Sequence, residues 1–264
     1  MESKKSSLAS STPNISPSAQ DEDIIVASKP QAGTTWLKVL VFTIVNRHFY
    51  TLSNTPLNSA NPHQLISHFE LFSTHLPYSM LADSIKRSNC RIVYITRNPF
   101  DIVVSLWHFM RGVYNLPDWS LEDCFEMFCR GEESYGPFWD HALGYWNMSV
   151  EKPSNILFMR YEELKEDQVA QTKRLAEFLG FPFSMEEEKT GVVNQIIDFC
   201  SFNNLKDLEV NKTGKIPRSI IPSNKLFFRS GEVGDYINHI SPAAVERLSN
   251  VLKEKLSGSS LAFN

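Results

Sequence analysis

Residues 23–38 combine an apolar run, a glycine-containing loop and the start of an amphipathic segment, a pattern suited to binding an anion. The apolar run predicts a buried strand, and the periodicity after it predicts a helix beginning at Thr34. The first N–H groups of a helix lack intrahelical partners, and the helix dipole adds partial positive charge there. The hydroxyls of Thr34 and Thr35 would face a phosphate bound at this end. The loop does not match the Walker A pattern, which places a Lys after its last Gly.

Two arginine segments could add charge-assisted bonds to a phosphate. Arg97 follows a predicted strand at its carboxyl end, where open α/β sheets bind ligands, and Ser105 lies two turns into the next helix. Arg229 stands two residues before Gly231, whose backbone can approach a ligand closely. Taken alone, Arg97 is more often part of a surface ion pair, and Ser105 more often lies on a polar helix face.

His75 follows another predicted strand, and a neutral histidine is a suitable base for a hydroxyl group. A structural histidine is the more common alternative for any single His. The remaining histidines have no comparable strand-end position and are predicted to be structural or exposed: His48, His63, His68, His108, His141 and His239. Trp36 and Phe202 could stack on an aromatic base, although a single aromatic residue more often belongs to the core.

These residues depend on strand-like and helix-like segments that alternate along the chain, which predicts an α/β fold with a parallel sheet flanked by helices. The apolar strands are expected to be buried on both faces, at residues 24–27, 70–74, 91–96 and 155–160. Helices are expected at residues 34–48, 81–88, 99–112, 121–130, 138–150, 161–179, 185–199 and 242–256. Residues 205–228 lack periodicity and are predicted to form a long functional loop.

The 264-residue chain has 26 basic and 30 acidic residues, and a formal net charge of -4 argues against nucleic acid or an anionic membrane as partner. Residues 1–20 are rich in Ser and lack the apolar region of a secretory signal, so we predict a disordered tail followed by a single domain at 21–264. No apolar run is long enough to span a bilayer. No metal-ligand spacing is present, and the four cysteines lack a C-x-x-C pair, so we expect buried free thiols and a cytoplasmic protein without a metal.

Six segments in this order resemble plant-type cytosolic sulfotransferases from about Asp23 to the C-terminus. The first is the loop 30–36, Pro-Gln-Ala-Gly-Thr-Thr-Trp, which resembles the phosphosulfate loop Pro-Lys-Ser-Gly-Thr-Thr-Trp. The others are Ser-Thr-His-Leu-Pro-Tyr at 73–78, the run 97–105, and the segments 135–146, 160–167 and 227–236. Each is moderately specific, and a chance match to all of them in order is difficult to accept.

The resemblance implies a P-loop-NTPase-like fold that binds 3′-phosphoadenosine 5′-phosphosulfate (PAPS) and transfers its sulfonate to a hydroxyl or oxime of a small molecule. His75 matches the base that deprotonates the acceptor. The positions that match nucleotide contacts are Gln31, Ala32, Gly33, Thr34, Thr35 and Trp36 at the 5′ end, Arg97, Ser105, Arg229, Ser230 and Gly231 at the 3′-phosphate, and Trp36, Tyr161 and Phe202 at adenine. The sequence does not define the acceptor or the oligomeric state.

Gln31 is the main departure from the family pattern, because it replaces a Lys that stabilises charge on the leaving phosphate. The loss of that charge would cost roughly 1–3 kcal/mol, or about 10–100-fold in rate. Lys29 is a candidate substitute, although Pro30 fixes the backbone between them. Ser230 likewise replaces a Lys. The chain is also shortened at the N-terminus and before Phe72, both on the acceptor side.

Three functions therefore compete. The first is an active sulfotransferase, and the second is a pseudoenzyme that binds PAPS or its product, adenosine 3′,5′-bisphosphate (PAP), with little turnover. The third is a P-loop nucleotide kinase, which the missing Walker Lys and the lack of an evident carboxylate partner for Mg²⁺ argue against.

Overall fold

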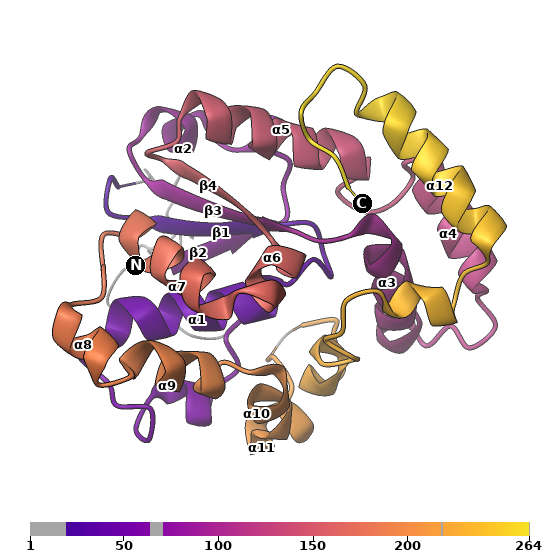
Figure 1. Cartoon of the computed structure of the whole chain (residues 1–264). Helices are drawn as coiled ribbons and strands as arrows, with labels where there is room; N and C mark the ends of the chain where they lie inside the picture. The colour runs from indigo at the N-terminus through magenta and orange to yellow at the C-terminus, as the bar shows by residue number, and fades with distance from the viewer. Residues whose placement is uncertain (1–19, 64–70, 218, 264) are drawn as a thin grey trace, which may run out of the picture.

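The computed structural model describes residues 20–63, 71–217 and 219–263. Most of the predicted tail, together with Glu70 and His68, therefore lies outside the described residues. The described part contains a parallel sheet of four strands in the order β2-β1-β3-β4 (Figure 1). The strands are β1 Ile24–Ser28, β2 Leu71–Thr74, β3 Arg91–Thr96 and β4 Ile156–Arg160. Ile24 of β1 pairs with Leu71 of β2 and with Arg91 of β3, and Ile92 of β3 pairs with Ile156 of β4.

Side chains that alternate along β1, β3 and β4 form two separate cores, one on each face of the sheet. Helices α1, Thr34–Asn46, and α7, Gln168–Phe178, contribute to one core. Helices α3, Pro99–Tyr114, α4, Leu121–Cys129, α5, Phe138–Glu151, and α12, Pro242–Lys255, contribute to the other. The predicted α/β fold and the burial of the central strands on both faces are confirmed.

Two predicted helices are each divided in the structure. The helix expected at 161–179 is α6, Tyr161–Glu166, followed by α7, because Asp167 leaves helical geometry and its carboxylate accepts a hydrogen bond from the N–H of Ala170. The helix expected at 185–199 is α8, Met185–Lys189, followed by α9, Val192–Phe199. Gly191 separates them with a left-handed φ of 78°, a conformation that glycine adopts readily. The helix expected at 81–88 is shorter in the structure, where α2 covers Asp83–Arg87.

The predicted loop at 205–228 contains short helices, and the prediction of an aperiodic loop was partly wrong. Helices α10, Phe202–Asp207, and α11, Glu209–Lys212, precede a 3₁₀ turn at Asn224–Phe227. Side-chain amides hold this segment together: Asn61 donates to Asn211 over 2.9 Å, and Asn224 donates to the carbonyl of Val210 over 2.9 Å. Such long-range bonds leave no periodic signal in the sequence.

The four cysteines are free and buried, as expected. None of the helices in the described part is long and apolar enough to cross a membrane.

Candidate functional site

A cavity of about 550 Å³ opens at the carboxyl ends of the strands and collects most of the predicted site residues. The β1–α1 loop, the start of α3, the β4–α6 junction and the segment 227–232 all contribute side chains to it. Of the predicted site residues, thirteen line it: Gln31, Gly33, Thr34, Thr35, Trp36, His75, Arg97, Ser105, Tyr161, Phe202, Arg229, Ser230 and Gly231. Ala32 does not line it, because its side chain is fully buried in the core behind the loop.

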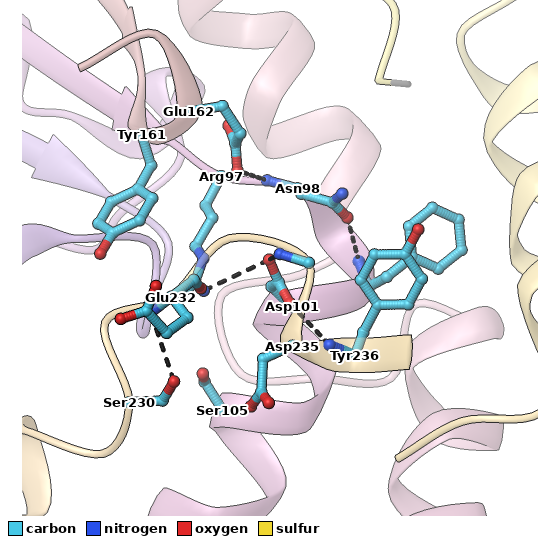
Figure 2. Close-up of polar contacts among 12 residues, drawn as sticks. Arg97, Asn98, Asp101, Ser105, Tyr161, Glu162, Ser230, Glu232, Asp235 and Tyr236 are labelled. Atoms are coloured by element: carbon cyan, nitrogen blue, oxygen red, sulfur yellow. Dashed lines mark hydrogen bonds and ion pairs between the residues drawn. The ribbon is translucent and has the colours of Figure 1, made fainter. Parts of the chain in front are cut away.

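Arg97 and Arg229 lie at one end of the cavity with Ser105 and Ser230. Figure 2 shows Arg97, Ser105 and Ser230. Arg97 is 5% exposed, forms an ion pair with Asp101 at 3.4 Å, donates to the carbonyl of Glu232 and lies over the ring of Tyr161. Arg229 forms an ion pair with Asp235 at 2.5 Å and donates to the hydroxyl of Ser105 over 3.3 Å. In each guanidinium the Nε atom is buried without a hydrogen-bond partner among the described residues. Two buried, incompletely bonded guanidinium groups fit a phosphate, which accepts several such bonds.

Asp101 holds the segment 229–236 against α3. Its carboxylate accepts hydrogen bonds from the N–H groups of Gly234 at 2.8 Å and Tyr236 at 3.0 Å (Figure 2). At the start of the same helix, Asn98 accepts from the N–H of Phe100, and its own N–H donates to Glu162. The two arginines, although far apart in sequence, are therefore fixed at one end of the cavity before any ligand binds.

The loop before α1 presents a helix N-terminus to the cavity. Gly33 has a φ of 107°, and a Cβ at this position would lie 2.9 Å from the ring of Tyr161, so another residue would be strained and crowded. No side chain caps the helix, because Gly33 is the N-cap residue. The hydroxyl of Thr34 is bonded to that of Ser28, and the hydroxyl of Thr35 is bonded to Nε2 of His63 at 3.1 Å.

Aromatic rings lie between the loop and the arginines. The rings of Trp36 and Tyr161 pack edge to face with centroids 5.2 Å apart. The hydroxyl of Tyr161 donates to the carbonyl of Gly231, and a Cβ on Gly231 would lie 2.5 Å from the ring of Phe202. Trp36, Tyr161 and Phe202 thus line one region of the cavity and could surround a planar base.

His75 is held in one tautomer at the other side of the loop. Its Nδ1 lies 2.8 Å from the carbonyl of Ser28, and a carbonyl only accepts, so Nδ1 carries the proton and Nε2 of the neutral ring carries the lone pair that can accept one. Burial lowers the pKa of His75; the bond to Ser28 opposes this, and the charges of Lys38 and Lys29 add to the lowering. The neutral form therefore predominates at pH 7, as a general base requires.

Helix α5 fixes the backbone of the His75 segment. Nε2 of His141 donates to the carbonyl of His75 over 3.0 Å, and the hydroxyl of Tyr94 donates to Nδ1 of His141 over 2.9 Å. The hydroxyl of Tyr145 donates to the carbonyl of Leu76 over 2.8 Å. Burial lowers the pKa of His141 to about 4, so this ring stays neutral and keeps its structural role.

Sequence reasoning missed one residue that lines the cavity, His63, and one buried residue that interacts electrostatically with it, Lys38. His63 was expected to be structural or exposed but lines the cavity, stacks on Phe227 with ring centroids 4.7 Å apart and bonds to Thr35. Lys38 lies one turn of α1 beyond Thr35, is 6% exposed and donates to the hydroxyl of Ser73 over 3.3 Å. The periodicity of α1 could have placed Lys38 below Thr35, but nothing in the sequence indicated its proximity to two histidines.

Lys29 does not reach the cavity. Its ammonium group donates to the carboxylate of Glu133 and to the carbonyl of Ser134, both over 3.0 Å, and both side chains of the ion pair are almost fully buried. Among the described residues, no group of His, Cys, Asp and Glu side chains could hold a metal ion.

Comparisons with known proteins identify the family of the chain and its fold. The family model described as Sulfotransferase domain matches residues 21–260. The chain belongs to the sulfotransferase family. It is 47% identical to cytosolic sulfotransferase 6 of Arabidopsis thaliana over 92% of this chain and 81% of the relative.

Two solved sulfotransferase structures have the same fold. A putative steroid sulphotransferase of Arabidopsis thaliana superposes with a TM-score of 0.69 at 36% identity, covering 93% of this chain and 80% of that one. The mouse sulfotransferase SULT7A1, crystallised with PAP, superposes with a TM-score of 0.72 at 28% identity, covering 91% of this chain and 86% of that one. The chain is thus a sulfotransferase with the α/β fold of its family.

Proposed function

We propose that this sulfotransferase takes its sulfonate from PAPS and transfers it to a hydroxyl or oxime of a small molecule, with His75 as the base. The observation that carries the proposal is the distribution of groups in one cavity. Two arginines whose Nε atoms have no partner in the described part of the chain lie at one end, and a histidine whose unprotonated Nε2 can accept a proton lies at the α1 end. The PAP bound to the mouse relative supports the choice of nucleotide.

The residues fit the nucleotide in three parts. Arg97, Ser105 and the segment Arg229 to Gly231 would hold the 3′-phosphate, which distinguishes PAPS from ordinary adenine nucleotides. Trp36, Tyr161 and Phe202 would surround adenine. The first N–H groups of α1 and the hydroxyls of Thr34 and Thr35 would bind the 5′ end, together with the Gln31 amide.

The donor supplies an electrophilic sulfur atom, and the protein supplies the base and its orientation. Nε2 of His75 accepts the proton of the acceptor hydroxyl as that oxygen bonds to sulfur and the S–O bond to the 5′-phosphate breaks. Ser28 keeps the opposite ring nitrogen protonated, so only Nε2 can take the proton. The products are the sulfated acceptor and PAP.

The acceptor side of the cavity is mainly apolar. Helix α3 contributes Phe109, Met110, Val113 and Tyr114, and the segment 216–227 contributes Ile216, Ile220, Ile221 and Phe227. Such a wall favours hydrophobic acceptors over strongly charged ones. The word cytosolic in the names of its relatives supports a place in the cytoplasm.

A transfer assay with labelled PAPS tests the proposal on a panel of phenols, flavonols, steroids and desulfo-glucosinolates. Transfer to one or more of these compounds, abolished by His75→Ala, is the expected result. Tight binding of PAP without transfer to any acceptor would favour the pseudoenzyme, for which the uncharged Gln31 is the supporting observation. Binding of ATP in preference to PAP would favour a kinase instead.

A further inference from the structure

Positive charge for the 5′ end of a nucleotide could come from a lysine at position 29, 31 or 38, which lie in or next to the β1–α1 loop. Residue 31 is Gln and carries no charge. Lys29 is neutralised by Glu133 and points toward the segment that contains Ser134. Of these three positions, Lys38 is then the lysine for which the described residues supply no carboxylate partner.

Lys38 is buried, and the described groups that it interacts with are not anionic. Its one hydrogen bond in the described structure goes to the neutral hydroxyl of Ser73, at a long 3.3 Å. Its charge acts on His63 and His75, and after burial it is the next largest cause that lowers the pKa of His63, to about 3. Burial also lowers the pKa of Lys38 itself, to about 8. A buried charge is normally paired, and an unpaired one destabilises the fold.

The position of Lys38 connects it to the 5′ end of the site. It lies three residues after Thr35 on α1, so both side chains lie on one face of the helix. Thr35 is bonded to His63, and both line the cavity next to Gln31 and His75. Lys38 itself does not line the cavity, but its charge acts on His63 and His75, and its flexible four-carbon side chain could extend to the cavity.

We propose that Lys38 supplies the positive charge of the subsite for the 5′-phosphosulfate group, in place of the lysine that position 31 lacks. The proposal rests on the proposed function, because the nucleotide is the anion that pairs with Lys38. Among the described residues the ammonium is hydrogen-bonded to Ser73 alone, and the bound 5′ group would supply a negative charge. The charge also helps to keep His75 neutral, which a base requires.

Calorimetric titration of Lys38→Met with two ligands tests the proposal. PAP carries both the 3′- and the 5′-phosphate, whereas adenosine 3′-monophosphate lacks the 5′ group. We expect Lys38→Met to weaken PAP binding by about tenfold or more, as for loss of a charged partner. Binding of adenosine 3′-monophosphate should change by less than about threefold, since its contacts lie at the arginine end. Lys253→Met, on the exposed side of α12, is the matched control and should leave both affinities unchanged.

Thermal unfolding without nucleotide separates this role from a structural one. If the role of Lys38 is to bind an anion, Lys38→Met should have the same melting temperature as the parent or a higher one. The reason is that the substitution removes a buried charge that has no carboxylate partner among the described residues. A lower melting temperature with equal weakening of both ligands would assign Lys38 to the fold and overturn the proposal. Unchanged binding of PAP would overturn it as well. Lys38→Gln gives the same comparison if the Met variant does not fold.

The failure of the proposed function gives a different result. If the parent protein binds neither PAP nor adenosine 3′-monophosphate, the nucleotide assignment is wrong and the Lys38 proposal is overturned with it. If the parent binds PAP and Lys38→Met binds it with the same affinity, the proposed function stands, the Lys38 proposal is overturned and the charge comes from another group.

Discussion

The buried ion pair of Lys29 and Glu133 gives a prediction that can be worked from the structure. The Nζ–Oε1 distance is 3.0 Å, and the two side chains are 1% and 3% exposed. Removal of one partner from a buried pair leaves the other charge in the interior, at a cost of about 3–5 kcal/mol. Lys29→Met should therefore lower the free energy of unfolding by about that amount, and Glu133→Gln should have a similar effect. At about 2–4 °C per kcal/mol for a domain of this size, the melting temperature should fall by roughly 6–20 °C.

The double variant Lys29→Met/Glu133→Gln should recover most of this loss, because no charge remains buried. Urea unfolding of the parent, both single variants and the double variant measures the coupling between the two sites. The exposed pair of Lys173 and Glu188, with side chains 40% and 43% exposed at 2.6 Å, is the matched control. The same double-variant cycle on Lys173 and Glu188 should give a coupling free energy of less than about 1 kcal/mol.

Two results would refute this reasoning. One is a loss of less than about 1 kcal/mol in the free energy of unfolding for Lys29→Met, and the other is a double variant that is no more stable than the single variants. The double variant also bears on function, since its Lys29 charge is absent while Lys38 is intact. Its affinity for PAP should equal that of the parent, and a marked loss would show that Lys29 supplies the charge at the 5′ end.

Further predictions concern the nucleotide and the base. Arg97→Ala should weaken the binding of PAP by about 10–150-fold, equivalent to roughly 1.5–3 kcal/mol, and leave the binding of adenosine 5′-monophosphate nearly unchanged in calorimetric titrations. Equal losses of affinity for the two nucleotides would show that Arg97 does not bind the 3′-phosphate. His75→Ala should abolish transfer and leave PAP affinity unchanged, since the base acts on the acceptor; a parallel loss of PAP affinity would make His75 structural. The pKa of His75 is lowered from 6.5, so the ring stays neutral down to a lower pH than a free histidine does. The acidic limb of the kcat/KM profile should therefore lie below pH 6.5. A limb above pH 6.5 would contradict the lowering of the pKa by burial and by the Lys38 and Lys29 charges.

The sequence alone indicated the central sheet and much of the nucleotide site. Apolar strands and the Gly-Thr-Thr loop are local patterns, and in a parallel sheet the carboxyl ends of the strands meet at one edge. That rule was enough to place Arg97, His75 and the α1 N-terminus near one another. The resemblance to sulfotransferases then assigned Arg229 to the same site, and the structure places it beside Ser105.

Other features depended on contacts between distant parts of the chain. The break at Asp167 divides a helix that its periodicity predicted to be continuous, because a side-chain cap competes with the helical pattern. Lys29, considered as a substitute for the missing lysine, is paired instead with Glu133, 104 residues away. His63 and Lys38 are unremarkable by type and spacing. His63 lines the cavity through its contacts with Thr35 and Phe227, and Lys38 acts on it from one turn beyond Thr35 on α1.

Local sequence thus determined the strands, most of the helices and the end of the sheet at which the cavity lies. The tertiary structure decided which lysine pairs with a carboxylate, which lysine has no such partner among the described residues, and which tautomer His75 adopts. The physical reason is that periodicity and capping act over a few residues, whereas burial and electrostatic pairing depend on every group brought within a few ångströms by the fold.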